Sequence, residues 1–577
     1  MRFLSIRTNF KICKRFVSFV LPEERSYTHG ESNIKLLPHT IGDRLIMAKN
    51  KAPDHIFINM MEQNISRNYN DFYNDCVKFG SGLIKLGMKP GEKVAIWSPN
   101  YYEWLVTSYA TALNGMILVN INPGYRQDEL CYALKKVGIK TIVCPKEFLS
   151  TKYYEILCKL VPEIDRLPEG SSGIKSKEFP LLKHVIVFDN KNENLRGSWK
   201  FQDICDLGGK EEEEILLKNN GKVKIDDIFN IQYTSGTTGL PKAVSLTHHE
   251  SKISICSPAP LFHCIGSVCS TLAGLITCNT INIPSPIFNA EKCLQTIDKF
   301  RPQYILGTPT MFIDIMNHKN FKDYDLQCLK CIFVGGAPCT EKLCNDLIKK
   351  FNLKKFCIGY GMTELSALAL TSNIDDNPYE NIKKTGYILP HLECSVTNKE
   401  DQIVSHGVVG ELCFRGYSIM KEYYNDEEKT RKELKKDRWF KTGDLGYMNK
   451  DGSIVITGRS KDMIIRGGEN IYPTEIEQLL MKIPGIQDVQ IVGVPNARLG
   501  EDVCAWICLK EDFKGIITQE DVINFCKNKI THFKIPKYIL FKKKHEFPRT
   551  NSGKIQKYKI EEISIKELNL EDVPKVL

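Results

Sequence analysis

The sequence predicts an α/β protein with a large N-terminal domain of layered α/β sheets plus a β-rich subdomain, and a small, mobile α+β C-terminal domain. Two observations predict this fold class. Short apolar segments alternate with helical ones at the spacing of a parallel sheet, and the pattern becomes β-rich after Gly410. A polar triplet at 460–462 then separates a last segment of about a hundred residues, in which helices and strands alternate again.

The first elements of the large domain are a helix and several buried strands. Residues 70–86 are expected to be helical, because Phe72, Cys76 and Phe79 lie near one face and the glycines and proline at 87–91 end the pattern. The polar segments 158–178 and 189–221 are interpreted as surface loops or insertions. A further helix is expected at 100–113, and strands are expected at 93–97, 116–119 and 140–144.

The second half of the large domain contains three apolar segments that end in small or polar residues. Such ends bring backbone groups to the carboxyl edge of a parallel sheet, where ligands bind. These three strands are expected at 303–307, 330–338 and 356–364. The β-rich part is expected at 411–415, 439–444 and 452–459. In the small domain we expect helices at 473–481 and 519–529, and strands at 487–494, 503–509 and 538–541.

A stretch rich in hydroxyl groups and glycine follows the apolar strand expected at 228–233. Its glycines permit a tight turn, and its backbone N–H and hydroxyl groups favour an anion-binding nest. The spacing is Gly-x-x-Gly-x-x-Lys, which differs from a Walker A loop. A flexible linker is the alternative, but the preceding strand and the final Pro-Lys disfavour it. The predicted triphosphate-binding loop consists of Thr234, Ser235, Gly236, Thr237, Thr238, Gly239, Leu240, Pro241 and Lys242.

Composition and charge argue against several other classes of protein. The net charge of +10 is spread over 577 residues, and no long basic stripe with interleaved aromatic residues indicates nucleic-acid binding. No run reaches the ~18 apolar residues of a transmembrane segment. The 21 cysteines have no repeated spacing, and Cys328 and Cys331 lack the second pair that a zinc site would need. Scattered thiols in a large chain are typical of a reducing compartment.

The N-terminal segment differs from the rest of the chain. Residues 1–21 contain basic and hydroxylated side chains, and the first acidic residue is Glu23. This composition is typical of a mitochondrial transit peptide, which we place at residues 1–28. It predicts a protein of the mitochondrial matrix; a ragged basic terminus is the alternative.

Several short motifs become informative through their order. Taken singly, the segments 360–364, 442–444 and 548–554 are compatible with turns or surface loops. In their order they resemble the AMP-forming acyl-CoA synthetases, a superfamily of adenylate-forming enzymes, from about Thr40 to Leu568. The segments after Arg459 and Ser552 look most like acyl-CoA synthetase family member 2, a mitochondrial subgroup linked to medium-chain fatty acids. The matching motifs are 234–242, 260–263, 360–364, 442–444, 458–462, 467–473 and 552–554.

The resemblance implies ATP-dependent activation of a medium-chain fatty acid, with Mg²⁺ as cofactor and coenzyme A as co-substrate. The fatty carboxylate would attack the α-phosphorus of ATP to give acyl-AMP and pyrophosphate, and coenzyme A would then displace AMP. Lys242 would bind phosphate, Thr363 would donate to a phosphate, and Glu364 would hold Mg²⁺. Lys554 would neutralise charge on the carboxylate and α-phosphate in the first half-reaction only.

The resemblance also implies a nucleoside site and an acyl site. Gly336 and Ala337 would form a flat slot for adenine that Tyr360 closes. Asp444 would accept hydrogen bonds from the ribose hydroxyls, and Arg459 would reach the ribose or a phosphate. The acyl site would contain Phe262, His263, Gly266 and Gly307.

For His263, a structural core histidine is the alternative interpretation. The domains are predicted at 29–459 and 463–577, joined by a hinge at 460–462 in which Lys461 is the pivot. Rotation at the hinge would withdraw the small-domain lysine at 554 and bring Gly467 and Gly468 to the pantetheine tunnel.

One departure from the family pattern lies between Lys242 and Pro260, where the segment is shorter by about one helix, which we place after Lys252. Either an exon is missing or the chain is a shortened isoform. This departure makes an inactive ATP- or acyl-binding chain one alternative to an active acyl-CoA ligase. A separate alternative is an adenylate-forming enzyme with another acceptor. Small molecules are the expected partners, and the sequence leaves the oligomeric state open, with a homo-oligomer as one alternative.

Overall fold

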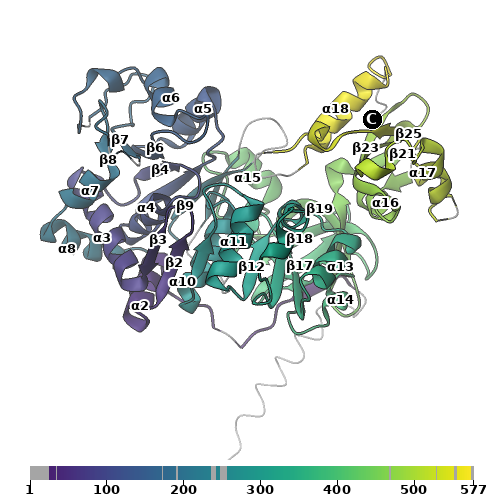
Figure 1. Cartoon of the computed structure of the whole chain (residues 1–577), viewed down its shortest axis with the longest axis horizontal. Coiled ribbons are helices and arrows are strands. Elements are labelled where there is room, and N and C mark those ends of the chain that lie inside the picture. Colours follow the sequence, from purple (N-terminus) through teal and green to yellow (C-terminus); the bar gives the residue numbers. More distant parts are fainter. Residues whose placement is uncertain are drawn as a thin grey trace, which may run out of the picture.

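Parallel strands with helices on both faces form the first sheet of the large domain (Figure 1). The computed structural model describes residues 25–573, except 34, 172, 190, 192, 235–241, 247–255, 467–468, 528 and 551–554. The strand order is β10-β9-β5-β4-β6-β7-β8, and only the β9–β10 pair is antiparallel. The strands are β4 (Lys93–Trp97), β5 (Ile117–Ile121), β6 (Thr141–Pro145), β7 (His184–Phe188), β8 (Trp199–Lys200), β9 (Asn230–Thr234) and β10 (Lys242–Leu246).

The helices that cover this sheet begin at capping residues and bury an apolar face, as α3 shows. In α3 (Tyr69–Lys85) the side chain of Asn68 accepts a hydrogen bond from the Asp71 N–H, and Phe72 and Phe79 are buried. The chain leaves the helix at Gly87, which has φ +83°. The other helices of this part are α2 (Ile41–Lys51), α4 (Tyr102–Leu113), α5 (Gln127–Val137) and α6 (Tyr153–Leu160).

The segment 189–221 was predicted as surface loops or insertions, but most of it is helical, so the loop interpretation is wrong for residues 201–220. It contains α7 (Phe201–Leu207) and α8 (Lys210–Asn220), and both helices contact α3. The Phe201 ring stacks on Phe79 with centroids 4.3 Å apart, and Leu216 is fully buried. Few apolar positions suffice here because a long neighbouring helix covers them, a tertiary effect that the local composition does not reveal.

The second sheet of the large domain contains parallel and antiparallel strands. Among them are the three strands whose ends were predicted to form the ligand site. Cys256 connects β11 with β12 in space, because it forms parallel bridges to Asn282 of β11 and Ile305 of β12. Its N–H donates to the Tyr304 carbonyl at 2.9 Å, and its carbonyl accepts from the Leu306 N–H at 3.1 Å. The strands are β2 (Ile56–Met60), β3 (Ile65–Asn68), β11 (Ile281–Ile283), β12 (Tyr304–Gly307), β13 (Cys331–Gly335), β14 (Lys355–Tyr360), β15 (Leu370–Thr371) and β16 (Tyr387–Ile388). Their helices include α11 (Ala290–Phe300), α12 (Pro309–Met316), α13 (Glu341–Lys350) and α14 (Pro378–Asn381).

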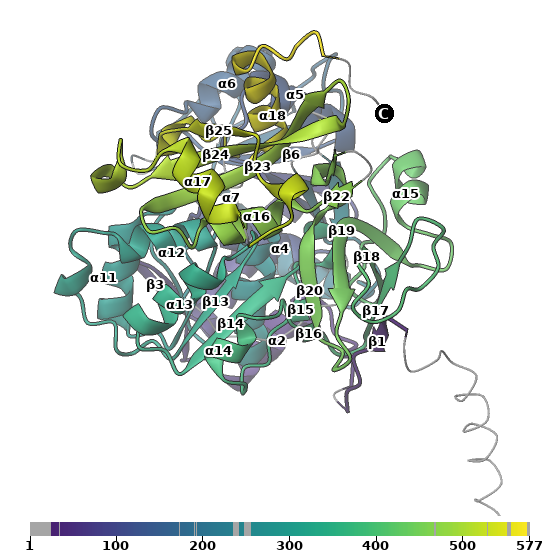
Figure 2. The ribbon, with the colours of Figure 1, turned by 90° about the vertical axis from the view of Figure 1, so that its right-hand side faces the viewer.

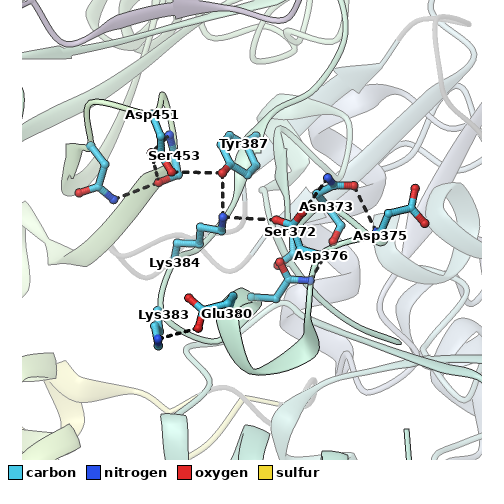
Figure 3. Close-up of polar contacts among 12 residues, drawn as sticks. Ser372, Asn373, Asp375, Asp376, Glu380, Lys383, Lys384, Tyr387, Asp451 and Ser453 are labelled. Carbon is cyan, nitrogen blue, oxygen red and sulfur yellow. Dashed lines mark hydrogen bonds and ion pairs between the residues drawn. The ribbon is translucent and has the colours of Figure 1, made fainter. Parts of the chain in front are cut away.

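The β-rich part is an antiparallel sheet of order β1-β17-β18-β19-β20. A polar network holds it against the second sheet (Figure 3). Lys384 Nζ lies 2.7 Å from the Tyr387 hydroxyl, which donates to Asp451 at 3.2 Å. The network thereby fixes β16 beside the turn that leads into β20. The strands are β1 (Tyr27–His29), β17 (Leu392–Thr397), β18 (Gly410–Gly416), β19 (Phe440–Met448) and β20 (Ile454–Arg459).

The C-terminal segment forms its own sheet and core. Ile476 and Ile491 are buried in one of its apolar clusters and Trp506 in another, and both clusters contain only residues after 463. Figure 2 shows these elements above α12 and α13, where Lys544 pairs with Asp314 at 3.0 Å. The strands are β21 (Ile464–Arg466), β22 (Glu469–Ile471), β23 (Ile486–Asn496), β24 (Gly500–Leu509) and β25 (Tyr538–Phe541). The helices are α16 (Pro473–Leu480), α17 (Gln519–Cys526) and α18 (Lys557–Glu567).

One buried carboxylate ties the strands of the small domain together. Asp502 in β24 is 0% exposed and accepts from Arg466 Nε at 2.5 Å, from Lys537 Nζ at 2.9 Å and from the Asn496 amide. Burial alone would raise the pKa of Asp502, but the hydrogen bonds from Arg466 and Lys537 outweigh it and lower the pKa below its ordinary value.

Replacing Asp502 with alanine is expected to lower the free energy of unfolding of the small domain by about 3 kcal/mol at pH 7, because two cations lose their buried partner. The native carboxylate has a lowered pKa, so its contribution is complete above the unfolded-state pKa and is lost as the pH falls through the native value. The gap between wild type and variant should therefore shrink in acid. Urea titration of the buried Trp506 fluorescence measures it, with the exposed Asp512→Ala as control.

Candidate active site

Three predicted nucleotide-binding residues meet between the second sheet and the β-rich sheet. Tyr360 ends β14, and Asp444 and Arg459 are opposite each other in the β19–β20 pair. The Tyr360 hydroxyl donates to Asp444 Oδ2 at 2.7 Å, and Arg459 Nε donates to Asp444 Oδ1 at 2.9 Å. Asp444 is only 4% exposed. Both oxygens of one buried carboxylate are therefore held in place by two neighbours.

The charges of this group are fixed by their mutual contacts. The Asp444 carboxylate raises the pKa of Arg459, which keeps its guanidinium charged. Burial, and then the same carboxylate, raise the pKa of Tyr360 well above its ordinary value. Tyr360 is therefore a hydrogen-bond donor throughout the neutral range. Each carboxylate oxygen has more than one lone pair, so Asp444 retains the capacity to accept from a ligand.

A glycine turn lies beside this group at the end of β13. Gly336 has φ +81°, a conformation that favours glycine. A Cβ atom there would lie 2.7 Å from the Ile265 side chain and 3.6 Å from Thr308. The turn predicted to hold adenine therefore contacts both segments that were predicted to hold the acyl group.

The predicted acyl residues lie on two neighbouring segments. His263 precedes the short helix α9 (Cys264–Gly266), and the Phe262 and His263 ring centroids are 6.4 Å apart. A Cβ atom at Gly266 would lie 2.3 Å from the Pro260 carbonyl oxygen, so only glycine fits this close approach. Gly307 ends β12 next to the ring of Phe312. The helix continues as a π-helical turn, η2 (Ser267–Leu272), a geometry that is frequent at functional sites.

Two contacts connect the acyl segment with the nucleotide side. Cys264 Sγ lies 3.6 Å from His263 Nδ1 and 3.8 Å from Thr363 Oγ1. Gln232 of β9 donates to Ser267 Oγ at 3.2 Å. The acyl candidates, Thr363 and the strand before the phosphate loop are thus parts of one continuous site.

Glu364 is held by a residue that the sequence did not reveal. It is buried in the short helix η4 (Thr363–Leu365), and its Oε1 accepts from the Tyr423 hydroxyl at 3.0 Å. The same hydroxyl also contacts Glu433, the last residue of α15 (Glu427–Glu433). Burial, followed by the Glu364 carboxylate, raises the pKa of Tyr423. No local pattern distinguishes Tyr423 from its neighbour Tyr424, so only the tertiary structure identifies it.

Part of the predicted site lies outside the described residues. This applies to Ser235, Gly236, Thr237, Thr238, Gly239, Leu240, Pro241, Gly467, Gly468 and Lys554. For Thr234 and Lys242 the backbone is described: they pair with each other in the antiparallel β9–β10 ladder. The predicted phosphate loop therefore connects the two strands of a hairpin, and β10 contacts η4 with its Thr363 and Glu364.

Lys461 lies in the short 3-10 turn η5 (Ser460–Asp462), between β20 and β21. It is exposed, and the turn connects the β-rich sheet with the sheet of the small domain. The position is compatible with a hinge, which stays a prediction together with the domain boundaries. Within the described part of the chain, no helix is both long and apolar enough to cross a bilayer.

The Gly336 turn follows β13, and Tyr360 ends the neighbouring parallel strand β14; nucleotides typically bind at such carboxyl ends of parallel strands. The AMP-binding enzyme family matches residues 47–424, and the AMP-binding enzyme C-terminal domain matches residues 475–554. The chain therefore belongs to the AMP-binding enzyme family, as an AMP-forming acyl-CoA synthetase. Enzymes of this class use ATP to convert a carboxylic acid through an acyl-AMP into an acyl-CoA.

The individual relatives agree with this family. The mouse protein named medium-chain acyl-CoA ligase ACSF2, mitochondrial, is 38% identical over 566 residues, which cover 94% of this chain and 91% of the relative. The human protein of the same name is 37% identical over 566 residues, with the same coverage. YngI of Bacillus subtilis is 38% identical and covers 93% of this chain and 99% of its own.

Solved structures match the fold at lower identity. The anthranilate CoA ligase AuaEII in complex with anthranoyl-AMP has a TM-score of 0.79 at 21% identity, covering 93% of this chain and 99% of that one. ATP-bound MatB from Rhodopseudomonas palustris has a TM-score of 0.76 at 22% identity, covering 91% and 99%. The predicted fold class, α/β with a large N-terminal domain and a small C-terminal domain, is thereby confirmed.

The comparisons do not favour the alternative of an inactive binding chain. Residues 247–255, which form the middle of the shortened segment between Lys242 and Pro260, lie outside the described residues, but the chain that follows them is described. Cys256 joins β11 to β12 there, and Leu261 N–H donates to Asn100 Oδ1 at 2.7 Å. The sheet is therefore continuous on the C-terminal side of the shortened segment.

Proposed function

We propose that this enzyme activates medium-chain fatty acids in mitochondria. The fatty carboxylate and ATP give acyl-AMP and pyrophosphate, and coenzyme A then displaces AMP to give the acyl-CoA. The observation that carries the proposal is the 38% identity, over 94% of the chain, to a protein named as a mitochondrial medium-chain acyl-CoA ligase.

The geometry supports specific roles for the nucleotide-side residues. Asp444 would accept hydrogen bonds from the ribose hydroxyls, and Tyr360 and Arg459 hold its two oxygens in position for this. Gly336 and Ala337 would lie against adenine, since the backbone of this turn has no side chain at its tightest point. Preorganised donors and acceptors of this kind lower the barrier because they need little rearrangement during the reaction.

The residues present fit a magnesium ion. Mg²⁺ prefers oxygen ligands and is usually bound by one or two carboxylates together with substrate phosphates. Among the described residues no cluster of three or more potential metal ligands occurs, so Glu364 would act with the phosphates of ATP. The Tyr423 hydroxyl would orient the Glu364 carboxylate. When bound, the ion would neutralise charge on the departing pyrophosphate.

The acyl group would lie between the His263 segment and the Gly307 segment. Both segments contact the Gly336 turn, which brings a bound carboxylate close to the nucleotide. The thiol of Cys264 lies between His263 and Thr363, one residue on the acyl side and one on the phosphate side. This arrangement supports a carboxylate held beside the phosphates before the first step.

The structure limits how many N-terminal residues could be removed after the proposed mitochondrial import. Residues Tyr27–His29 form β1, which pairs with β17, and Ser26 is fully buried. Removal of all 28 predicted transit residues would delete most of this strand. We therefore place the end of the removed segment before Arg25, which would leave β1 intact.

The proposal is tested by measuring pyrophosphate release with ATP, coenzyme A and saturated fatty acids of increasing length. We expect turnover with chains of about 6–12 carbons, the largest kcat/KM near octanoate, and one molecule of AMP for each acyl-CoA formed. Omitting coenzyme A should leave roughly one equivalent of pyrophosphate per enzyme, because the acyl-AMP stays bound. A preference for acetate, for palmitate or for aromatic acids would contradict the proposed chain length. Absence of pyrophosphate release with every acid would contradict the activity itself.

A further inference from the structure

Two thiols meet at the start of helix α13, directly after the Gly336 turn. Cys339 lies in the turn before the helix and Cys344 in its first full turn, and their sulfur atoms are 3.2 Å apart. Between them, Thr340 caps the helix by accepting from the Leu343 N–H at 3.3 Å. The proposed mechanism uses neither thiol.

Their positions have an ordinary structural explanation as well. Residues just before the cap and four after it form a hydrophobic staple, which fixes the angle at which the chain enters a helix. Any two apolar side chains serve this purpose. Two thiols in contact, one of them partly exposed, add a chemistry that apolar side chains lack: Cys339 is half-buried and Cys344 is buried.

The turn that carries Cys339 has little room to adjust. Gly336 lies three residues earlier in the left-handed region, where a Cβ atom would already come within 2.7 Å of Ile265. Ala337 and Pro338 are the only residues between this constrained glycine and Cys339. A covalent bond at Cys339 would therefore act on the turn proposed to bind adenine.

A second thiol pair nearby provides an internal comparison. Cys331 of β13 and Cys357 of β14 have sulfur atoms 4.0 Å apart, but they are only 2% and 4% exposed. Cys339 is therefore more exposed than either residue of this strand pair. In the part of the chain that the structure describes, every cysteine is a free thiol.

We propose that Cys339 and Cys344 form a reversible disulfide in the presence of a hydroperoxide, and that this bond weakens ATP binding. The Cys339 thiolate attacks the peroxide oxygen, the O–O bond breaks, and a sulfenic acid and an alcohol or water are formed. The Cys344 sulfur then attacks the sulfenic sulfur, and water leaves with the second thiol proton. The two thiols lose two electrons and the hydroperoxide gains them; a dithiol reductant reverses the bond.

The contact with the Cys344 thiol, together with burial, raises the pKa of Cys339. Because the thiolate is the reacting form, oxidation at neutral pH is slow, over minutes to hours rather than seconds. The predicted weakening of ATP binding rests on the proposed function, whereas formation of the Cys339–Cys344 disulfide does not.

The test uses the full chain, reduced and then treated with millimolar hydrogen peroxide. After alkylation, trypsin cleaves behind Lys342 and separates the peptides 331–342 and 343–349, which only a disulfide holds together. We expect a linked pair that is two hydrogens lighter than the sum of its parts. The KM for ATP should rise at least about five-fold, the lower end of typical coupling between sites. The KM for octanoate should stay unchanged, and dithiothreitol should restore the original value.

Cysteine variants test whether Cys339 and Cys344 are the two residues that form the disulfide. Cys339→Ser and Cys344→Ala should abolish both the linked peptide and the peroxide effect, whereas the buried control Cys331→Ala should retain both. A disulfide formed through Cys331 instead of Cys339, or a peroxide effect that persists in Cys344→Ala, would overturn the proposal. So would the absence of any link. Direct titration with a fluorescent ATP analogue separates the two hypotheses: a chain that binds ATP redox-dependently but activates no fatty acid contradicts only the proposed function.

Discussion

Replacing Asp444 with alanine is expected to lower kcat/KM for ATP by about 10²–10⁴-fold, because hydrogen bonds to a charged group contribute about 1.5–3 kcal/mol each and the two ribose hydroxyls would lose the acceptor that we propose for them. The same change leaves the Arg459 guanidinium and the Tyr360 hydroxyl without the oxygens that they contact at 2.9 and 2.7 Å. Steady-state kinetics at varied ATP measure the loss, and thermal melting shows whether the fold survives.

Two further variants serve as controls. One removes only the charge of Asp444, and the other changes an acidic residue of a neighbouring turn. Asp444→Asn keeps the size and one acceptor oxygen, so we expect a loss of about tenfold. Asp451→Asn changes an acid of the neighbouring turn, where the contacts are with Ser453 and Tyr387 and not with the nucleotide candidates. It should leave the KM for ATP unchanged. If Asp444→Ala and Asp451→Asn behave alike, Asp444 has no role in nucleotide binding.

Strands were predictable where the apolar run is short and bounded by turn residues. The predicted ranges 93–97 and 538–541 coincide with β4 and β25. β4 lies between β5 and β6 and is largely buried, whereas β25 pairs with β24 and is bounded by Lys537 and Lys542. The helices α7 and α8 were missed because their stability depends on α3: Glu212, for example, is buried and paired with Lys85 at 2.8 Å. Such a pairing between positions 127 apart in the chain leaves no local signal.

The candidate site likewise has a part that was predictable from the sequence and a part that was not. Tyr360 and Asp444 are 84 positions apart, yet each belongs to a short motif whose order indicated one nucleotide site, and the structure brings them into contact. The support behind the motifs was not predictable. Tyr423 contacts two acidic residues from different elements, and Cys264 lies between His263 and Thr363. These contacts depend on how the sheets pack, which neither composition nor periodicity encodes.

The other large effect is expected for Lys554, which lies outside the described residues and whose role is a prediction from the resemblance. Lys554→Ala should slow pyrophosphate release with octanoate and ATP by about 10³-fold, because no cation then offsets the charge that gathers between the carboxylate and the α-phosphate. Synthetic octanoyl-AMP should still react with coenzyme A at nearly the wild-type rate, since the lysine would act in the first half-reaction only.

Two half-reactions measured on one variant distinguish this role from general damage. Pyrophosphate release reports the first step, and thioester formation from octanoyl-AMP reports the second. Lys559→Ala is the control, because it removes the same charge from an exposed position of α18, five residues further on, and should leave both steps intact. Unfolding of the small domain would slow both steps, whereas a lysine needed only for adenylation slows one. Equal losses in both half-reactions would therefore remove Lys554 from the catalytic site, and with it the reason for proposing that the small domain rotates between the two steps.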